Sequence, residues 1–115
     1  ATREVTTVAG LYNTLGTTNG IGSAARFRSP NALVATSTDL YVSDSGNHTI
    51  RQVALSNFNV TTLAGAAGTA AFADGNAANA RFNTPSGITI NGNYLYLADF
   101  GNNRIRWIYC KSFPI

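Results

Sequence analysis

Charged side chains are scarce in this sequence, and long apolar runs are absent from it. Only 11% of the 115 residues are Asp, Glu, Lys or Arg, against roughly 25% in an average globular protein. This low charge argues against a highly charged disordered segment and against a coiled coil, which needs charged flanking positions. No apolar stretch approaches the roughly 18 residues of a membrane-spanning helix, so we expect no membrane insertion. The length and the hydrophobic content of 44% fit one globular domain.

Cysteine and methionine are also nearly missing. The single cysteine, Cys110, cannot form an internal disulfide or a multi-cysteine metal site. There is no methionine, even at position 1, which indicates a processed chain or a fragment. One lysine among many Thr, Asn, Gly and Ser residues favours an extracellular, cell-surface or periplasmic protein. The net charge of +3 is spread along the chain, so it does not favour a nucleic-acid partner.

The most informative feature is an internal repeat with a constant spacing of 55 residues. The segment VTTVAG at 5–10 returns as VTTLAG at 60–65, and LYVSD at 40–44 returns as LYLAD at 95–99. The units 5–59 and 60–114 share 19 identical positions without a gap. Chance would give only a few matches, so the sequence is a duplication. We therefore treat residues 1–115 as one segment made of two repeat units.

Each unit is expected to be all-β. Its β-branched and aromatic runs are bounded by turn residues such as Asn, Asp and Gly, which predicts four short strands per unit. Four strands in a repeat of this length are typical of a β-propeller blade, which must stack on neighbouring blades. The predicted strands are 5–9, 32–35, 40–43 and 49–53 in the first unit, and 60–64, 87–90, 95–98 and 104–108 in the second.

These residues resemble the NHL repeat. The resemblance is carried by DG at 74–75, ARF at 80–82, PSGI at 85–88 and GNNRIR at 101–106, and it is closest to bacterial repeats with a long loop. The first unit repeats GNHTIR at 46–51 but has Asn19-Gly20 where the second has Asp-Gly. The resemblance implies an all-β propeller of about six blades, each of four antiparallel strands. This chain supplies two of them.

The strand order predicts that further propeller blades are the partners of this chain. The chain opens with a fourth strand, completes one blade and stops after a third strand. Either more blades lie in a longer chain, which the interruption in mid-pattern favours, or the N-terminal strand of one copy completes the last blade of another. In the second case three copies would close a ring of six blades.

Positions that are identical in both units are assigned to the blade rather than to binding. An Asp before a Gly-Asn turn can accept backbone N–H bonds and fix the turn. Repeated arginines are expected to tie strands or blades together. The residues given these structural roles are Asp44, Asp99, Arg26, Arg81, Arg51 and Arg106.

Unmatched positions and loop residues are the candidates for binding. In a propeller, the loops from fourth to first strands and from second to third strands lie on one rim. An aromatic and polar mixture there suits a protein or glycan ligand, whereas the alternative is a scatter of exposed residues with no partner. Trp107 and Tyr109 are expected to pack at a blade interface. The rim candidates are Tyr12, Arg28, His48, Phe100, Asn102 and Asn103.

No residue pattern points to catalysis, to a metal or to a cofactor. A catalytic zinc site takes three protein ligands, and His48 and Cys110 alone cannot supply them. Neither a nucleophile elbow nor a phosphate loop is present. We predict a non-enzymatic binding, interaction or structural module. The alternatives are a lyase-like propeller enzyme with ligands in absent blades, and an RNA-binding NHL domain.

Overall fold

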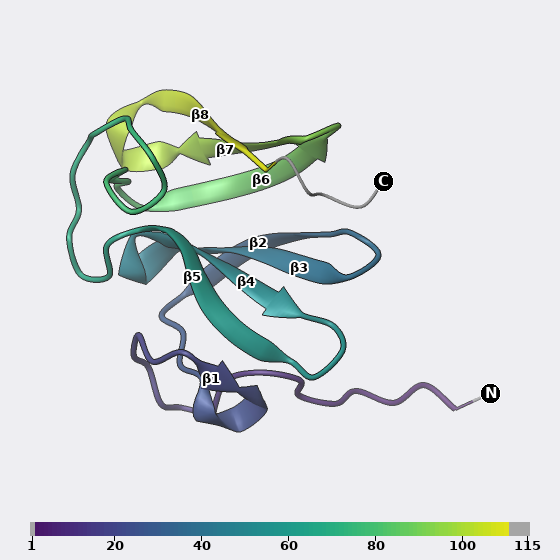
Figure 1. Cartoon of the computed structure of the whole chain (residues 1–115). Coiled ribbons are helices and arrows are strands. Elements are labelled where there is room, and N and C mark those ends of the chain that lie inside the picture. Colours follow the sequence, from purple (N-terminus) through teal and green to yellow (C-terminus); the bar gives the residue numbers. More distant parts are fainter. Residues whose placement is uncertain (1, 111–115) are drawn as a thin grey trace.

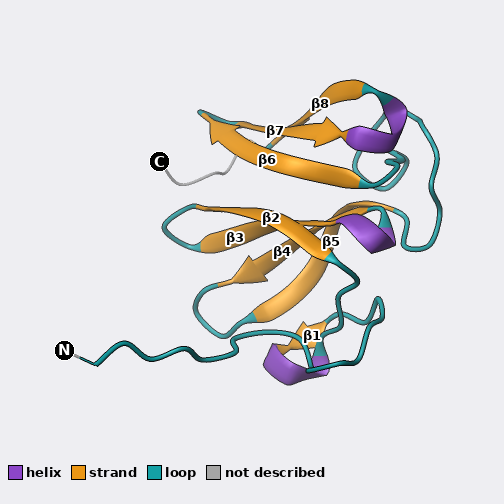
Figure 2. Cartoon of the chain, turned by 180° about the vertical axis from the view of Figure 1, so that it is seen from behind, coloured by secondary structure: helices purple, strands orange, loops and turns teal. Residues whose placement is uncertain are grey.

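The computed structural model describes residues 2–110, which form two antiparallel β-sheets stacked on each other (Figure 1). The strand order is β1-β5-β4-β3-β2 in the first sheet and β6-β7-β8 in the second. Short 3-10 helices accompany the strands, and the described residues contain no α-helix (Figure 2). The elements are β1 Gly20–Ile21, η1 Gly22–Ala24, β2 Pro30–Ala35, β3 Asp39–Asp44, η2 Ser45–Asn47, β4 Thr49–Ala54, β5 Asn59–Gly65, β6 Pro85–Asn91, β7 Tyr94–Asp99, η3 Phe100–Asn102 and β8 Arg104–Tyr109.

The all-β expectation is confirmed, and β2 to β8 each cover one of the predicted strands. Alternation is the physical reason, because successive side chains of a strand point to opposite faces. In β7, Leu95 and Leu97 are buried, whereas Tyr94 and Tyr96, which alternate with them, are only half-buried. One face of this strand therefore packs into the core and the other faces outward.

The strand predicted at residues 5–9 is wrong, because this segment joins no sheet within residues 2–110. A strand is held by hydrogen bonds to a neighbouring strand. In the described chain, no strand lies beside residues 5–9 as β4 lies beside β5. Val5 is 101% exposed, whereas its repeat counterpart Val60 in β5 is 0% exposed. The short strand β1 was not expected, and it pairs with β5, with Gly20 opposite Val60.

The sheets are offset from the repeat units. Strand β5 opens the second unit in sequence but pairs with β4, with Thr49 opposite Gly65 and Val53 opposite Val60. The first sheet therefore contains the four strands of a complete blade, together with β1. The second sheet has three described strands, and the counterpart of β5 would begin at residue 114, which lies outside the described residues.

The main hydrophobic core lies between the two sheets. Tyr41 and Ile50 of the first sheet pack with Phe82, Leu95 and Leu97. Burial of one such aliphatic or aromatic side chain contributes roughly 1.5–3 kcal/mol. This core therefore holds the two blades in register.

The opposite face of the first sheet is covered only in part. Val42, Val53 and Val60 form a smaller cluster on that side. Leu33 of β2 is 60% exposed, whereas its counterpart in β6, Ile88, packs against the main core. The face of β6 is thus covered by the first blade, whereas no blade of the described chain covers the equivalent face of β2.

Hydrogen bonds reinforce the joint between the blades. The Ser45 hydroxyl donates to the carbonyl oxygen of Pro85, at the start of β6. The backbone N–H of Thr84 donates to Nδ1 of His48 at 2.9 Å. Both bonds run from the turn after β3 to the start of the next blade.

Candidate functional site

A buried carboxylate anchors the turn that follows β3. Oδ1 of Asp44 accepts from the backbone N–H of Arg28 at 2.8 Å. Oδ2 accepts from the Asn47 amide at 2.7 Å and from Nη1 of Arg51 at 2.9 Å. Asp44 is fully buried, and these three bonds take up both of its oxygens. The anchor ties η2 to β4 and to the loop that leads into β2.

The second blade repeats this anchor. Oδ1 of Asp99 accepts from the backbone N–H of Asn83 at 2.8 Å. Oδ2 accepts from the Asn102 amide at 2.8 Å and from Nη1 of Arg106 at 2.6 Å. Asp99 is also fully buried. The two aspartates, although separated by 55 positions, therefore have the same structural environment.

The arginines of these pairs also hold the long loops. Arg51 donates from Nη1 to the carbonyl of Arg26 at 2.8 Å and from Nη2 to that of Thr18 at 3.1 Å. Arg106 makes the equivalent Nη1 bond to the carbonyl of Arg81 at 3.0 Å. These bonds join each third strand to the loop of its own blade rather than to the neighbouring blade. Within residues 2–110, the side chains of Arg26 and Arg81 bond nearby carbonyls of their own loops.

The loops that carry the rim candidates lie at one end of the stacked sheets. The turns η2 and η3 and the long loop before β6 gather on the same side of both blades (Figure 2). Four candidates are exposed there: Tyr12, Arg28, Phe100 and Asn103. The exposed aromatic and polar candidates therefore come from loops of both blades.

The other two candidates are already bonded within the fold. His48 accepts the Thr84 bond at the blade joint. The Asn102 amide donates to the carbonyl of Ala71 at 2.8 Å as well as to Asp99. The sequence predicted His48 and Asn102 at the rim, and both lie in the loops at that end. Their side chains, however, make hydrogen bonds within the fold.

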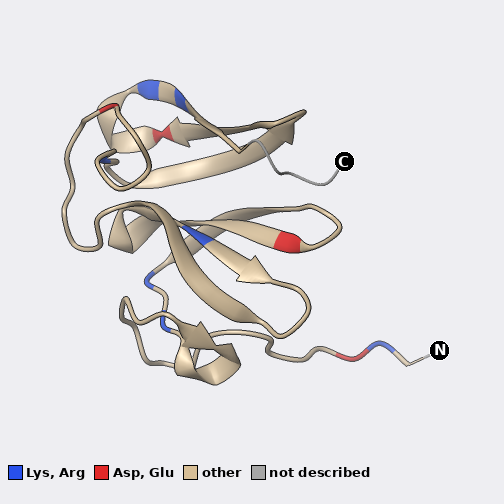
Figure 3. Cartoon of the chain, viewed as in Figure 1, with Lys and Arg blue, Asp and Glu red and all other residues tan. Residues whose placement is uncertain are grey.

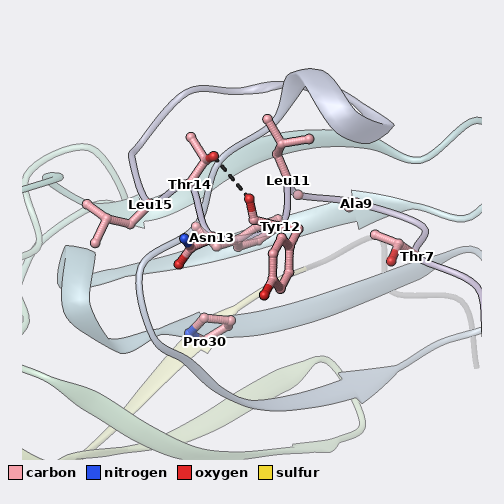
Figure 4. Close-up of a pocket in the computed structure, with 10 residues that line it drawn as sticks. Thr7, Ala9, Leu11, Tyr12, Asn13, Thr14, Leu15 and Pro30 are labelled. Carbon is pink, nitrogen blue, oxygen red and sulfur yellow. Dashed lines mark hydrogen bonds between the residues drawn. The ribbon is translucent and has the colours of Figure 1, made fainter.

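Tyr12 borders a shallow hollow beside the first blade (Figure 4). The hydroxyl of Thr14 donates to the carbonyl of Tyr12 at 3.1 Å, which closes a tight turn. The phenol ring of Tyr12 is 94% exposed and shares the hollow with Phe27 and Pro30. This part of the rim presents an open aromatic ring above an apolar floor.

A second hollow, the edge groove, runs along β8. Ala80, Phe82 and Ile108 are in the floor of its inner part, which has a volume of about 320 Å³. At its outer end the guanidinium groups of Arg104 and Arg106 lie 4.6 Å and 4.8 Å from the ring centre of Phe72. The residues that define the edge groove are Phe72, Asp74, Gly75, Ala80, Phe82, Arg106, Trp107 and Ile108.

Sequence reasoning did not identify the edge groove. The available signal was in the unmatched positions, because Thr17 and Thr49 of the first unit correspond to Phe72 and Arg104 of the second. Trp107 was expected to pack between blades. In the described chain it is 60% exposed and contacts Tyr94 edge-on at 5.0 Å.

Positive charge is distributed rather than gathered. The arginines of the described residues lie on several separate segments (Figure 3). Arg51 and Arg106 are buried in ion pairs, and Arg26 and Arg81 are bonded to loop carbonyls. Residues 2–110 contain no group of three or more His, Cys, Asp or Glu side chains that could share a metal ion. No helix in this part of the chain is long and apolar enough to cross a membrane.

Comparisons with known proteins identify the repeat. The NHL repeat family model matches residues 82–108. The chain is 36% identical over 95 residues to Protein SUPPRESSOR OF QUENCHING 1, chloroplastic, from Arabidopsis thaliana, which covers 81% of this chain and 9% of that protein. It is also 36% identical over 95 residues to NHL repeat-containing protein 2 from Homo sapiens, across 79% of this chain and 13% of the relative. The chain thus spans a small part of the curated relatives it matches.

A solved structure shows the same architecture. The chain is similar to an auxiliary nutrient binding protein from Bacteroides thetaiotaomicron, with a TM-score of 0.78 and 30% identity. The match covers 86% of this chain and 27% of the solved chain. The repeated Asp–Arg anchors, the four-stranded blade and these similarities agree with one another. The chain therefore belongs to the NHL-repeat β-propeller family.

Proposed function

We propose that this chain is a non-enzymatic interaction module of an exported or cell-surface NHL propeller, and that its rim contacts a glycan. The observation that carries the proposal is a contrast between two sets of residues. Asp44 and Asp99 are buried and fully bonded, so they are not free to act as general acids or bases. The exposed residues at the same end include the aromatic rings of Tyr12 and Phe100.

The chemistry of the rim fits a flat polar ligand. Aromatic rings present a large apolar area at a low conformational cost, and Tyr adds a polar group. The exposed guanidinium of Arg28 donates hydrogen bonds, and the exposed amide of Asn103 both donates and accepts them. Sugars offer hydroxyl groups beside apolar C–H faces, so this mixture can contact both parts of a glycan.

Two further observations support the location and the ligand class. The low charge and the abundance of Thr, Asn, Gly and Ser favour an exported surface. The similar Bacteroides protein is described as an auxiliary nutrient binding protein, and fold similarity by itself does not transfer a ligand. The rim residues must therefore be tested directly in this chain.

Affinity electrophoresis through gels that contain starch, xylan, pectin or mucin tests the proposal. We expect at least one polysaccharide to retard the wild-type chain, and Tyr12→Ala or Phe100→Ala to weaken the retardation about tenfold, the equivalent of about 1.4 kcal/mol. Ser37→Ala, at an exposed position in the turn between β2 and β3, is the matched control. Equal retardation of all variants, or no retardation by any of the four, would contradict the rim assignment.

The enzyme alternative is tested on the same polysaccharides. After prolonged incubation with the chain, with and without added Zn²⁺, we expect no new reducing ends and no unsaturated ends. Formation of either product that is lost in Tyr12→Ala would replace the binding proposal with a catalytic one.

A further inference from the structure

We propose that the contact between the two blades is sensitive to pH, because His48 accepts a hydrogen bond across it with an unprotonated ring nitrogen. The backbone N–H of Thr84 donates to Nδ1 of His48 at 2.9 Å. Protonation of Nδ1 replaces the acceptor by a second donor, so the bond is lost and the contact is weaker at mildly acidic pH. This inference concerns the joint between the two described blades and does not depend on the glycan proposal.

The hydrogen bond specifies the form of the ring at neutral pH. A neutral imidazole carries one proton, and its other nitrogen is the acceptor. Because Nδ1 accepts from Thr84, the proton of neutral His48 lies on Nε2. His48 is half-buried rather than enclosed in the core, so its ring exchanges protons with solvent in the folded chain.

Backbone packing constrains both partners of the bond. His48 has φ of 60°, and its N–H donates to the carbonyl oxygen of Ser45 at 3.2 Å. The carbonyl oxygen of His48 lies so close to Gly65 that a Cβ atom added there would be 2.6 Å away. Thr84 has φ of 55°, which is unusual for a β-branched residue. The Thr84 N–H is therefore held toward the ring and is not free to turn to another acceptor.

The described residues around the joint offer no free carboxylate to a protonated His48. Asp44 and Asp99 are fully buried, and each accepts three hydrogen bonds. Asp74, on the long loop before β6, pairs with Arg106. Arg28 packs against Gly46 of η2 and adds positive charge to the same turn, which opposes a second cation there. The charged residues on the elements that meet at the joint are Arg26, Arg28, Asp44, Arg51, Asp74, Arg81 and Asp99.

The other bonds across the joint do not respond to mild acid. The hydroxyl groups of Ser43 and Ser45 donate to the carbonyl oxygens of Ser86 and Pro85. The core between the sheets is apolar. Loss of the His48 bond therefore loosens the joint locally without separating the blades.

The second unit suggests a variant of this turn that does not titrate. Asn103 is the counterpart of His48 and has φ of 56°. The side-chain oxygen of Asn is an acceptor that can take the place of Nδ1, and its amide does not titrate. We expect His48→Asn to keep the turn and the bond and to remove the response to pH. His48→Ala removes the bond at every pH.

Imidazole ¹⁵N NMR of the full chain tests the form of the ring. His48 is the only histidine of the chain, so its ring signals are unambiguous. At about pH 7.5, we expect a proton on Nε2 and none on Nδ1. A proton on Nδ1 at that pH would overturn the proposal.

Hydrogen exchange of the Thr84 amide measures the strength of the bond. An unperturbed imidazole takes up its second proton near about pH 6.5, so the bond is present well above that pH and is lost as the pH falls below it. Between about pH 7.5 and about pH 5, we expect the protection of this amide to fall about tenfold in the wild type and to stay constant in His48→Asn. The amide of Leu55, which donates to the carbonyl of Thr38 at 2.9 Å at the other end of the sheet, is the reference.

Urea unfolding at the same two pH values gives a second readout. Other titrating groups affect the wild type, His48→Asn and His48→Ala alike, so the differences between them isolate His48. We expect acidification to lower the unfolding midpoint of the wild type more than that of either variant. If His48→Ala does not fold, the comparison with His48→Asn decides. A parallel loss in the wild type and His48→Asn, or equal protection of the wild-type Thr84 amide at both pH values, would overturn the proposal.

Discussion

His48 accepts a hydrogen bond from the backbone N–H of Thr84 and thereby links the turn of the first blade to the start of the second. The counterpart of His48 in the second blade is Asn103, which is exposed. Both residues have left-handed backbone geometry, with φ of 60° and 56°. The same turn therefore contacts the next blade in the first unit and is exposed in the second.

The first prediction concerns this bond. Replacement of His48 by Ala removes the acceptor, and Asn103→Ala is a matched control because both changes place Ala in a left-handed conformation at equal cost. We expect His48→Ala to lower the free energy of unfolding by about 1 kcal/mol more than Asn103→Ala does. Urea denaturation at a concentration where the chain is monomeric measures the difference. Equal losses would mean that the bond contributes nothing net.

The two buried ion pairs should differ in their sensitivity to substitution. Asp44→Asn leaves the buried guanidinium of Arg51 without an anion, which costs about 3–5 kcal/mol. Asp99→Asn should cost less, because Arg106 retains Asp74 at 2.9 Å. Thermal unfolding of both variants tests the order. Asp74→Asn, at an exposed position, should change stability by less than about 1 kcal/mol, and a reversed order of the first two variants would contradict this account.

Gly46 should not tolerate a side chain. A Cβ atom there would lie 2.6 Å from Cγ and 2.7 Å from the carbonyl oxygen of Arg28, which is anchored by Asp44. We expect Gly46→Ala to destabilise the fold by about 1–3 kcal/mol, as overpacking does. Gly87→Ala, where a Cβ meets nothing within 4 Å, is the control and should have little effect. Denaturation midpoints of the two variants provide the comparison.

Tyr41 should control stability at alkaline pH. Burial, together with the negative charges of Asp39 and Cys110, raises the pKa of Tyr41 to about 12. The unfolded chain releases this proton near pH 10.0, so the stabilisation is complete below that pH and is lost as the pH rises toward 12. Tyr41→Phe should unfold at a higher pH than the wild type in an alkaline titration followed by circular dichroism. An identical midpoint would show that another group controls alkaline unfolding.

Most strands could be predicted because their signals are local. The alternation in 95–98 and the turns that bound it indicate a strand without knowledge of any partner. Residues 5–9 have the same local signals as β5, yet they form no strand in the described chain, because pairing depends on an edge elsewhere. Strand β1 was missed for the opposite reason. Its two residues have no periodicity, and it exists because β5 lies beside Gly20.

The sequence indicated which loops carry the candidate residues, but not which of their polar atoms form hydrogen bonds within the fold. Exposure of Tyr12 and Phe100 agrees with their place in loops. The bond between His48 and Thr84 joins residues 36 positions apart, and a self-comparison at a spacing of 55 cannot reveal a contact between units. The edge groove could not be predicted from the sequence, because it is formed by the packing of loops beside β8 and not by a sequence motif. Burial likewise raises the pKa of the Cys110 thiol, and a sequence contains no direct record of burial.

The offset between the sheets and the repeat units has a consequence for how such a gene can grow. A DNA duplication of the 55-residue unit copies a strand that completes the sheet of the preceding unit, as β5 completes the first sheet. The first strand of every added unit therefore pairs with the sheet of the preceding unit. Conversely, a gene fragment cut at the repeat boundary, such as 5–59, encodes a blade without its outer strand, whereas one cut at 30–65 encodes all four. The repeated sequence unit and the folded blade are thus offset from each other by one strand.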